Sequence, residues 1–319
     1  MIRRLIVLLS CFVLLMLFLR GYAVKKEEGQ LFTVSRTATT EDVREKIQEQ
    51  EFMRGRWFFG ISLLPHGGYG AIDPGGYRVS PSMGSWTLAS VLTSDPPLKW
   101  AVIPEGFRKE QVADRLTTSL GWDRAKRDQF LEAAVATPYD LTDGFYYPDT
   151  YLIPTDEDVE KVTKRFISRF NEHFDPLVPE FRDANIKFDT AVKLASILQR
   201  EAAGKEDMPL IAGILWNRLL QKMPLEVDAT LQYARGNTGS GYWAPISVAD
   251  KQIDSPFNTY KHAGLPPAPI SNPGLDAINA VIHSQETPCI FYLHAPDRQI
   301  HCAETYEGHL ENIERYLRN

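Results

Sequence analysis

The residue with the clearest chemical potential is Glu201, which closes the stretch LASILQRE (194–201). In an α-helix, residues three, four and seven positions apart share one face. That spacing is kept by Leu194, Ile197, Leu198 and Glu201. The pattern therefore predicts a helix over 190–203, capped by Asp189 or Thr190, with a carboxyl on its apolar side. Burial raises the pKa of a carboxyl, which suits a general acid near neutral pH.

A plainer interpretation is that Glu201 lies at a frayed helix end and pairs with a nearby arginine. On this helix alone, the plainer interpretation is the favoured one, because ion pairs at helix ends are common. The choice between an acid catalyst and a surface ion pair therefore depends on the rest of the chain.

Motifs for other chemistries are missing from the sequence. It contains no HExxH, paired CxxC, GxGxxG, P-loop or GxSxG motif, so we expect no metal and no cofactor. Four histidines near the C-terminus have the wrong spacing for zinc and are interpreted as surface or hydrogen-bonding residues: His283, His294, His301 and His309. The remaining candidates are carboxylates and aromatic residues, a combination typical of glycan cleavage but also of any tyrosine-rich core.

The bulk composition limits the class of partner. The chain has 319 residues, enough for about two domains, and a net charge of −6. Nucleic-acid binding proteins usually carry a basic patch, so the acidic balance argues against a nucleic-acid partner.

The N-terminus predicts a membrane anchor over residues 1–24, with the transmembrane part at about 5–23. Arg3 and Arg4 precede fifteen almost wholly apolar residues, 5–19, which Arg20 and Tyr22 can extend toward a full span. The positive residues place the short N-terminus in the cytoplasm and the body outside it. The alternative is a cleaved signal peptide, but no clear cleavage site follows.

The body of the chain predicts an α+β fold. Residues 31–50 and 100–119 each have the pattern of a strand, a turn and a helix, and together they indicate a small α+β module. Three further helices are expected at 157–174, 208–222 and 274–285, whereas 224–273 is loop-rich. Loops of that length in a compact domain are usually functional.

Two cysteines, Cys289 and Cys302, flank a predicted hairpin that turns at 295–298. In a symmetric hairpin the two residues face one another, at a separation that allows a disulfide. Two buried free thiols are the equally weighted alternative.

Seven segments in one order resemble the YceG-like (MltG/YceG) endolytic murein transglycosylases. They are IPEGF (103–107), DGFYYPDTY (143–151), LASILQREA (194–202), PLIAGILWNRL (209–219), MPLEVDATLQYARG (223–236), FNTYKHAGLPPAPISNPG (257–274) and HCAETYEGHLEN (301–312). The resemblance runs from about residue 30 to the end of the chain.

The resemblance implies a single-pass protein of the bacterial inner membrane with a periplasmic body. It also implies a LysM-like module at 25–125 and a mixed α+β catalytic domain at 126–319. Such proteins cut nascent peptidoglycan strands between MurNAc and GlcNAc and leave 1,6-anhydroMurNAc ends, which terminates elongation. The expected partners are therefore peptidoglycan glycan strands and the peptidoglycan synthases.

Residue by residue, the family's catalytic glutamate corresponds to Glu201. By motif position we expect a substrate groove that includes Asp228, Asn258, Thr259 and Tyr260. Asp228 has the alternative role of a helix cap, and Asn258 that of a turn residue.

The chain departs from the family pattern at four positions. Gln199 replaces an acid two residues before Glu201, Asp143 stands for Glu, Phe257 for Tyr and Cys302 for an aromatic residue. None of these changes removes the candidate acid. Two other functions stay open: a noncatalytic peptidoglycan-binding scaffold, and a hydrolytic muramidase with Asp228 as its second carboxylate.

Overall fold

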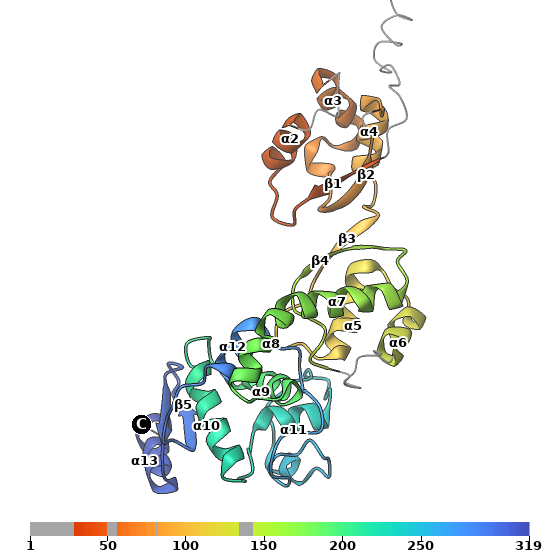
Figure 1. Cartoon of the computed structure of the whole chain (residues 1–319). Coiled ribbons are helices and arrows are strands. Elements are labelled where there is room, and N and C mark those ends of the chain that lie inside the picture. Colours follow the sequence, from red (N-terminus) through yellow and green to blue (C-terminus); the bar gives the residue numbers. More distant parts are fainter. Residues whose placement is uncertain (1–28, 50–55, 81, 134–142, 319) are drawn as a thin grey trace, which may run out of the picture. The chain divides into compact units, whose positions relative to one another are not determined.

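The computed structural model describes residues 29–49, 56–80, 82–133 and 143–318 (Figure 1). The predicted membrane anchor over 1–24 lies outside these ranges. Among the residues described, none of the helices has both the length and the apolar character that a membrane span requires.

The chain divides into two compact units. Each contains helices and a β-sheet, which confirms a mixed α+β architecture. The first unit runs up to Ala101 and includes 119–121 and 150–157. The second unit comprises 102–118, 122–149 and 158–319. The expected limit between a module at 25–125 and a catalytic domain at 126–319 stays a prediction.

A four-stranded sheet with the order β1-β2-β3-β4 forms the centre of the first unit. Its strands are β1 (Gln30–Val34), β2 (Gly75–Val79), β3 (Leu98–Val102) and β4 (Thr150–Pro154). β1 and β2 are antiparallel with Phe32 opposite Tyr77, and β2 and β3 are antiparallel with Gly76 opposite Leu98. The helices of this unit are α2 (Thr40–Glu49), α3 (Arg56–Leu63) and α4 (Ser85–Leu92), with short 3₁₀ turns at Leu64–His66 and Tyr69–Ala71.

The core of the first unit lies between the sheet and the helices. Phe32 and Tyr77 from the strands are buried with Val43 and Ile47 of α2. The four-residue spacing of Val43 and Ile47 explains why α2 turns one face inward. This α+β unit has the strand and helix that the sequence predicted for 31–50, while its likeness to a LysM module stays a prediction.

The second unit is built around α9 (Phe188–Glu201), which packs against α10 (Met208–Leu220) and α12 (Leu275–Ile282) (Figure 1). Leu194, Ile197 and Leu198 are fully buried, as the spacing predicted. The other elements of this unit are α5 (Lys109–Leu120), α6 (Arg124–Glu132), α7 (Val159–Phe174), α8 (Val178–Asp183), α11 (Asp228–Arg235), β5 (Phe291–His294), β6 (Ile300–Ala303) and α13 (Tyr306–Leu317), with 3₁₀ turns at Asp175–Leu177 and Val248–Gln252.

The bounds of α9 differ slightly from the prediction. The helix begins at Phe188 with Lys187 as its N-cap, because the Ala191 N–H already donates to the Lys187 carbonyl at 3.0 Å. The expected caps Asp189 and Thr190 are therefore inside the first turn. At the other end Glu201 is the last helical residue.

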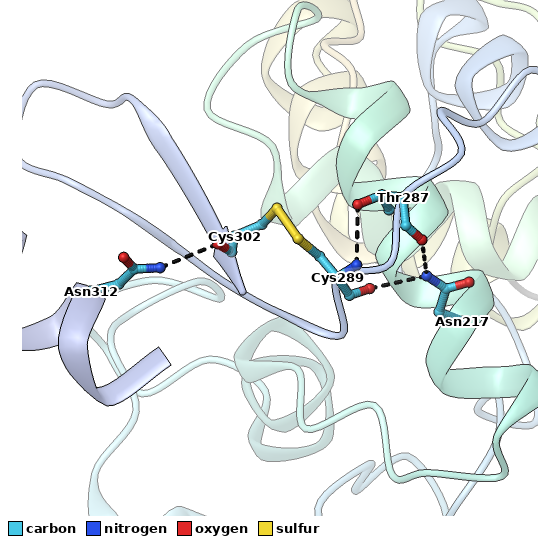
Figure 2. Close-up of a disulfide and its surroundings, with 5 residues drawn as sticks. All are labelled: Asn217, Thr287, Cys289, Cys302 and Asn312. Atoms are coloured by element: carbon cyan, nitrogen blue, oxygen red, sulfur yellow. Dashed lines mark hydrogen bonds between the residues drawn. A yellow bond between two sulfur atoms is a disulfide. The ribbon is translucent and has the colours of Figure 1, made fainter. Parts of the chain in front are cut away.

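The C-terminal hairpin carries the disulfide between Cys289 and Cys302, with a Cα–Cα distance of 5.9 Å (Figure 2). The disulfide is thus confirmed, but the symmetric register is wrong. Cys302 lies opposite Tyr292 in the β5–β6 ladder, and Leu293 lies opposite His301. The turn places Arg298 in the left-handed region, with its N–H bonded to the Ala295 carbonyl at 2.8 Å, and this geometry shifts the pairing.

Candidate active site

Glu201 lies where the end of α9, the start of α11 and strand β5 meet. The Tyr292 hydroxyl donates to Glu201 Oε2 at 2.8 Å. The backbone N–H of Ala229, in the first turn of α11, also hydrogen-bonds to the carboxyl. Two donors from two elements therefore fix the orientation of this side chain.

Surrounding Glu201 is a cavity of about 460 Å³. Charged and polar residues form much of its lining: Glu201, Arg218, Glu226, Asp228, Lys251, Tyr260, Tyr292 and His294. Phe291, Tyr306 and His309 add aromatic surface. This volume is within the range of about 300 to 1,000 Å³ that is typical of ligand pockets.

The surroundings of Glu201 raise its pKa above that of an ordinary glutamate. Burial is the main cause, opposed by the Tyr292 hydrogen bond. The negative charge of Asp228 raises the pKa further, while the Ala229 N–H and His294 lower it. The carboxyl is consequently protonated at a higher pH than a solvent-exposed glutamate, as a general acid requires.

Asp228 and Tyr260 form a second polar pair in the same cavity. The Tyr260 hydroxyl donates to Asp228 Oδ1 at 2.6 Å. The Lys251 ammonium lies 4.4 Å from the centre of the Tyr260 ring. Asp228 is the first residue of α11, and its side chain makes no capping bond there, because Val227 is the N-cap. The structure therefore brings Glu201, Asp228 and Tyr260 together.

Asn258 and Thr259 are placed differently, because both are buried within the loop that carries Tyr260. Asn258 donates to the carbonyls of Lys251 and Ile253 at 3.1 and 2.8 Å, and accepts from the Tyr260 N–H at 3.0 Å. Thr259 Oγ1 accepts from the Val227 N–H at 3.1 Å. The two side chains thus stabilise the loop that carries Tyr260, and they do not line the cavity themselves.

Strand β5 is held in place by two neighbouring residues of α10. Asn217 donates to the carbonyls of Thr287 and Cys289 at 2.7 and 3.0 Å (Figure 2). Arg218 donates through Nε to the Ile290 carbonyl at 2.6 Å and through Nη1 to the Leu225 carbonyl at 2.7 Å. These bonds satisfy backbone groups that precede β5, and they explain the WNRL segment in physical terms.

His294 is paired with a carboxylate. Its Nε2 lies 2.7 Å from Asp207 Oδ2. Asp207 also accepts from the N–H groups of Ala203 and Gly204, just after Glu201. His283 is likewise paired with Glu180 at 2.8 Å. Both residues are hydrogen-bonding histidines, as the spacing indicated, and no cluster of metal ligands occurs within the described part of the chain.

Sequence reasoning missed several of the residues that line this cavity, chiefly Tyr292, Arg218 and Lys251. Tyr292 is 91 positions from Glu201 in the sequence, so no periodicity connects them. The usable signal was the short aromatic strand IFYLH (290–294), which lies between the two cysteines of the predicted hairpin.

The YceG-like family matches residues 32–315. The chain belongs to the YceG-like family. An endolytic murein transglycosylase of Streptococcus pneumoniae (serotype 2, strain D39) is 26% identical over 283 residues, which cover 78% of this chain and 51% of that protein. One of Bacillus subtilis (strain 168) is 31% identical over 176 residues, which cover 55% of this chain and 48% of that protein.

This YceG-like chain therefore spans about half the length of the curated relatives it matches. The crystal structure of a yceG-like protein from Listeria monocytogenes matches it with a TM-score of 0.61 at 21% identity, covering 90% of this chain and 99% of that one. At this identity, the likeness shows a common fold.

Proposed function

We propose that this YceG-like protein is an endolytic lytic transglycosylase with Glu201 as its catalytic acid. It cleaves peptidoglycan strands between MurNAc and GlcNAc, leaves 1,6-anhydroMurNAc ends and so terminates strand elongation. The observation that carries the proposal is the Glu201 carboxyl, whose pKa is raised and which lines a cavity of about 460 Å³. The names of the two bacterial relatives support the same activity.

The reaction needs one carboxyl that gives and then takes a proton. Neutral Glu201 protonates the glycosidic oxygen, and the bond from that oxygen to C1 of MurNAc breaks. The C6 hydroxyl of the same sugar then bonds to C1, and its proton returns to Glu201. Intramolecular attack has a large proximity advantage. The reaction consumes no water and needs no second carboxylate.

The neighbours of Glu201 suit these two proton transfers. As the carboxyl becomes negative, the Tyr292 hydroxyl and the Ala229 N–H stabilise the charge through their hydrogen bonds. Asp228 and Tyr260 are our candidates for binding sugar hydroxyls, because both line the cavity. Asn258 and Thr259 keep an indirect role in this proposal, through the loop that positions Tyr260.

The proposal includes anchoring by residues 5–23, with the body in the periplasm. The disulfide between Cys289 and Cys302 supports an oxidising compartment, because structural disulfides are rare in the cytosol. A LysM-like role for the first unit and synthases as partners belong to the same proposal.

A hydrolytic muramidase is the second candidate, and one observation favours it. Asp228 lines the same cavity as Glu201 and is close enough to affect its pKa. A second carboxylate is what an ordinary glycoside hydrolase uses to activate water or to form a covalent intermediate.

Product analysis with the full chain in detergent separates these functions. We expect anhydro-muropeptides when purified glycan strands are digested with the wild type and with the control Glu206→Gln, which changes an exposed carboxylate nearby. Glu201→Gln should release product at least about a hundredfold more slowly. Reducing ends one water heavier would support the hydrolase, and cleavage by Glu201→Gln at the wild-type rate would exclude Glu201 as the acid. Binding without cleavage by the wild type would favour a noncatalytic scaffold.

A further inference from the structure

The Tyr292 hydroxyl hydrogen-bonds to Glu201, but Tyr292 lies on strand β5 whereas Glu201 ends helix α9. It lies 2.8 Å from Glu201 Oε2, and the residue lines the same cavity. Burial, followed by the charge of Glu201, raises the pKa of Tyr292 well above its ordinary value. Tyr292 therefore remains a hydrogen-bond donor throughout the pH range in which Glu201 titrates.

Strand β5 is restrained just before Tyr292 and on the partner strand opposite it. Asn217 and Arg218 of α10 donate to three backbone carbonyls just before the strand, those of Thr287, Cys289 and Ile290. The disulfide joins Cys289 to Cys302 (Figure 2). Cys302 lies opposite Tyr292 in the β5–β6 ladder. Such support is what a side chain needs to hold another group within a fraction of an ångström.

We propose that Tyr292 is the positioning residue for the catalytic carboxyl of Glu201. The inference rests on the proposed function and adds a residue to it. Tyr292 acts through Glu201, since it holds the carboxyl plane while the proton goes to the glycosidic oxygen and while the proton of the C6 hydroxyl returns. Its hydrogen bond strengthens when Glu201 becomes negative, after the bond from C1 to the glycosidic oxygen has broken.

Several other charged or titratable groups surround Glu201 and Tyr292, and a test substitution should leave them unchanged. Asp228 and Tyr260 face Glu201 from the start of α11 and from its neighbouring loop. His294 acts on Glu201 from β5, and Arg200 from its own helix. Arg218 acts on Tyr292. Replacing only the Tyr292 hydroxyl leaves all of these groups in place.

The first experiment compares Tyr292→Phe with the wild type in the full chain. A hydrogen bond to an ionised group is lost, so we expect kcat to fall by about tenfold to a hundredfold, with KM within about twofold. The Tyr292 hydrogen bond lowers the pKa of Glu201, so its removal should move the alkaline limb of the pH–rate profile to higher pH. The matched control is Tyr316→Phe in α13, where the ring stacks on His301.

A second measurement does not depend on activity. The carboxyl of Glu201 is titrated by carbon NMR in wild type, Tyr292→Phe and Tyr316→Phe. We expect a higher midpoint in Tyr292→Phe alone. If Tyr292→Phe does not fold, 3-fluorotyrosine at position 292 keeps the ring and makes the hydroxyl a stronger donor, which should lower the midpoint instead.

The outcomes separate this inference from the proposed function. A shifted midpoint and a lower kcat in Tyr292→Phe support it. An unchanged Glu201 titration, or a loss of activity that appears only in KM, overturns it even when the wild type makes anhydro products. Failure of the wild type to cleave would overturn the proposed function, whereas the titration still decides whether Tyr292 controls the Glu201 carboxyl.

Discussion

Two carboxyl–tyrosine pairs in the second unit have nearly the same local geometry. Tyr292 donates to Glu201 Oε2 at 2.8 Å, and Tyr233 donates to Asp143 Oδ2 at 2.8 Å. In both, burial raises the pKa of the carboxyl, and for Asp143 it reaches about 7. A perturbed carboxyl pKa is often used to suggest an active site. By this criterion alone the two pairs would be equivalent.

Access distinguishes the pairs. Glu201 lines the cavity, whereas Asp143 is only 2% exposed. Asp143 accepts from the Lys109 N–H at the start of α5 at 2.6 Å, and so connects its loop to α5 and, through Tyr233, to α11. The guanidinium of Arg108 covers the Tyr233 ring at 4.2 Å. The comparison teaches that a raised pKa indicates burial, while a catalytic role also requires room for a substrate.

The largest expected difference is in the rate of glycan cleavage by two variants, one with a substitution in each pair. Glu201→Gln removes the proposed acid and should lower kcat by roughly 10²- to 10⁴-fold, the usual contribution of general acid catalysis. Asp143→Asn keeps a carbonyl oxygen that can accept from the Lys109 N–H. Because Asp143 is buried and does not line the cavity, kcat should stay within about threefold of the wild-type value, far from the loss expected for a general acid. Initial rates of release of anhydro-muropeptides measure both.

Circular dichroism and thermal unfolding serve as controls, because a misfolded variant would also lose activity. A fall in kcat of comparable size in a well-folded Asp143→Asn would contradict the distinction by access. It would give the sealed pair a part in the reaction.

The next effect concerns the disulfide, which supports one pair and not the other. Replacing both Cys289 and Cys302 with serine opens a loop of sequence separation 13. Chain entropy predicts a loss of about 3 kcal/mol in the free energy of unfolding. Hydrogen exchange should accelerate at the amides of β5 around Tyr292, and stay unchanged around Asp143. Mass spectrometry of exchanged peptides measures both regions.

Treatment with a reducing agent is the matching control. It should reproduce the change in the wild type and have no effect on the double-serine variant. Equal acceleration in the two regions would mean that the disulfide stabilises the whole unit and is not specific to the Glu201 side.

The pH dependence of stability is expected to reflect the sealed pair. The pKa of Asp143 rises from an ordinary 3.8 to about 7 on folding, chiefly through burial. Between these values the folded chain binds more protons than the unfolded chain, so this contribution to the free energy of unfolding falls as pH rises. Below pH 3.8 it is fully present, and above about pH 7 it is lost.

Asp143→Asn removes this titration and should flatten the dependence over the same window. Urea midpoints at intervals between the two pKa values compare the variant with the wild type. Glu201 contributes with the same sign in both proteins, so the difference between the two curves isolates Asp143. Parallel curves would contradict the assignment.

The sequence predicts what lies within one element better than what lies between elements. Helical spacing identified Glu201 on the apolar side of α9, and Leu194 and Ile197 are fully buried as expected. The partner hydroxyls could not be found this way, because Tyr292 and Tyr233 are 91 and 90 positions from their carboxyls. The hairpin was predicted and its disulfide was one of two equally weighted alternatives, but the register depends on the conformation of one turn.

Other segments that identified the family are explained by backbone support. Asn272 accepts from the N–H groups of Gly144 and Tyr146 at 2.9 Å each, and donates to the Phe107 carbonyl at 2.8 Å. Gly144 has a φ of 95°, and an added Cβ would lie 2.8 Å from Pro269. Such roles require three separate segments to meet, which single-sequence patterns do not reveal.

The smallest expected effect comes from Tyr233→Phe, the counterpart of Tyr292→Phe in the sealed pair. The hydroxyl of Tyr233 lowers the pKa of Asp143, so its removal raises that pKa further. The cost should be about 1 to 3 kcal/mol where Asp143 is ionised and has lost a donor. It should be smaller at acid pH, where the neutral carboxyl needs that donor less. Urea unfolding at two pH values measures the difference, and kcat should stay at the wild-type level. A fall in kcat with unchanged stability would reverse the roles assigned to the two tyrosines.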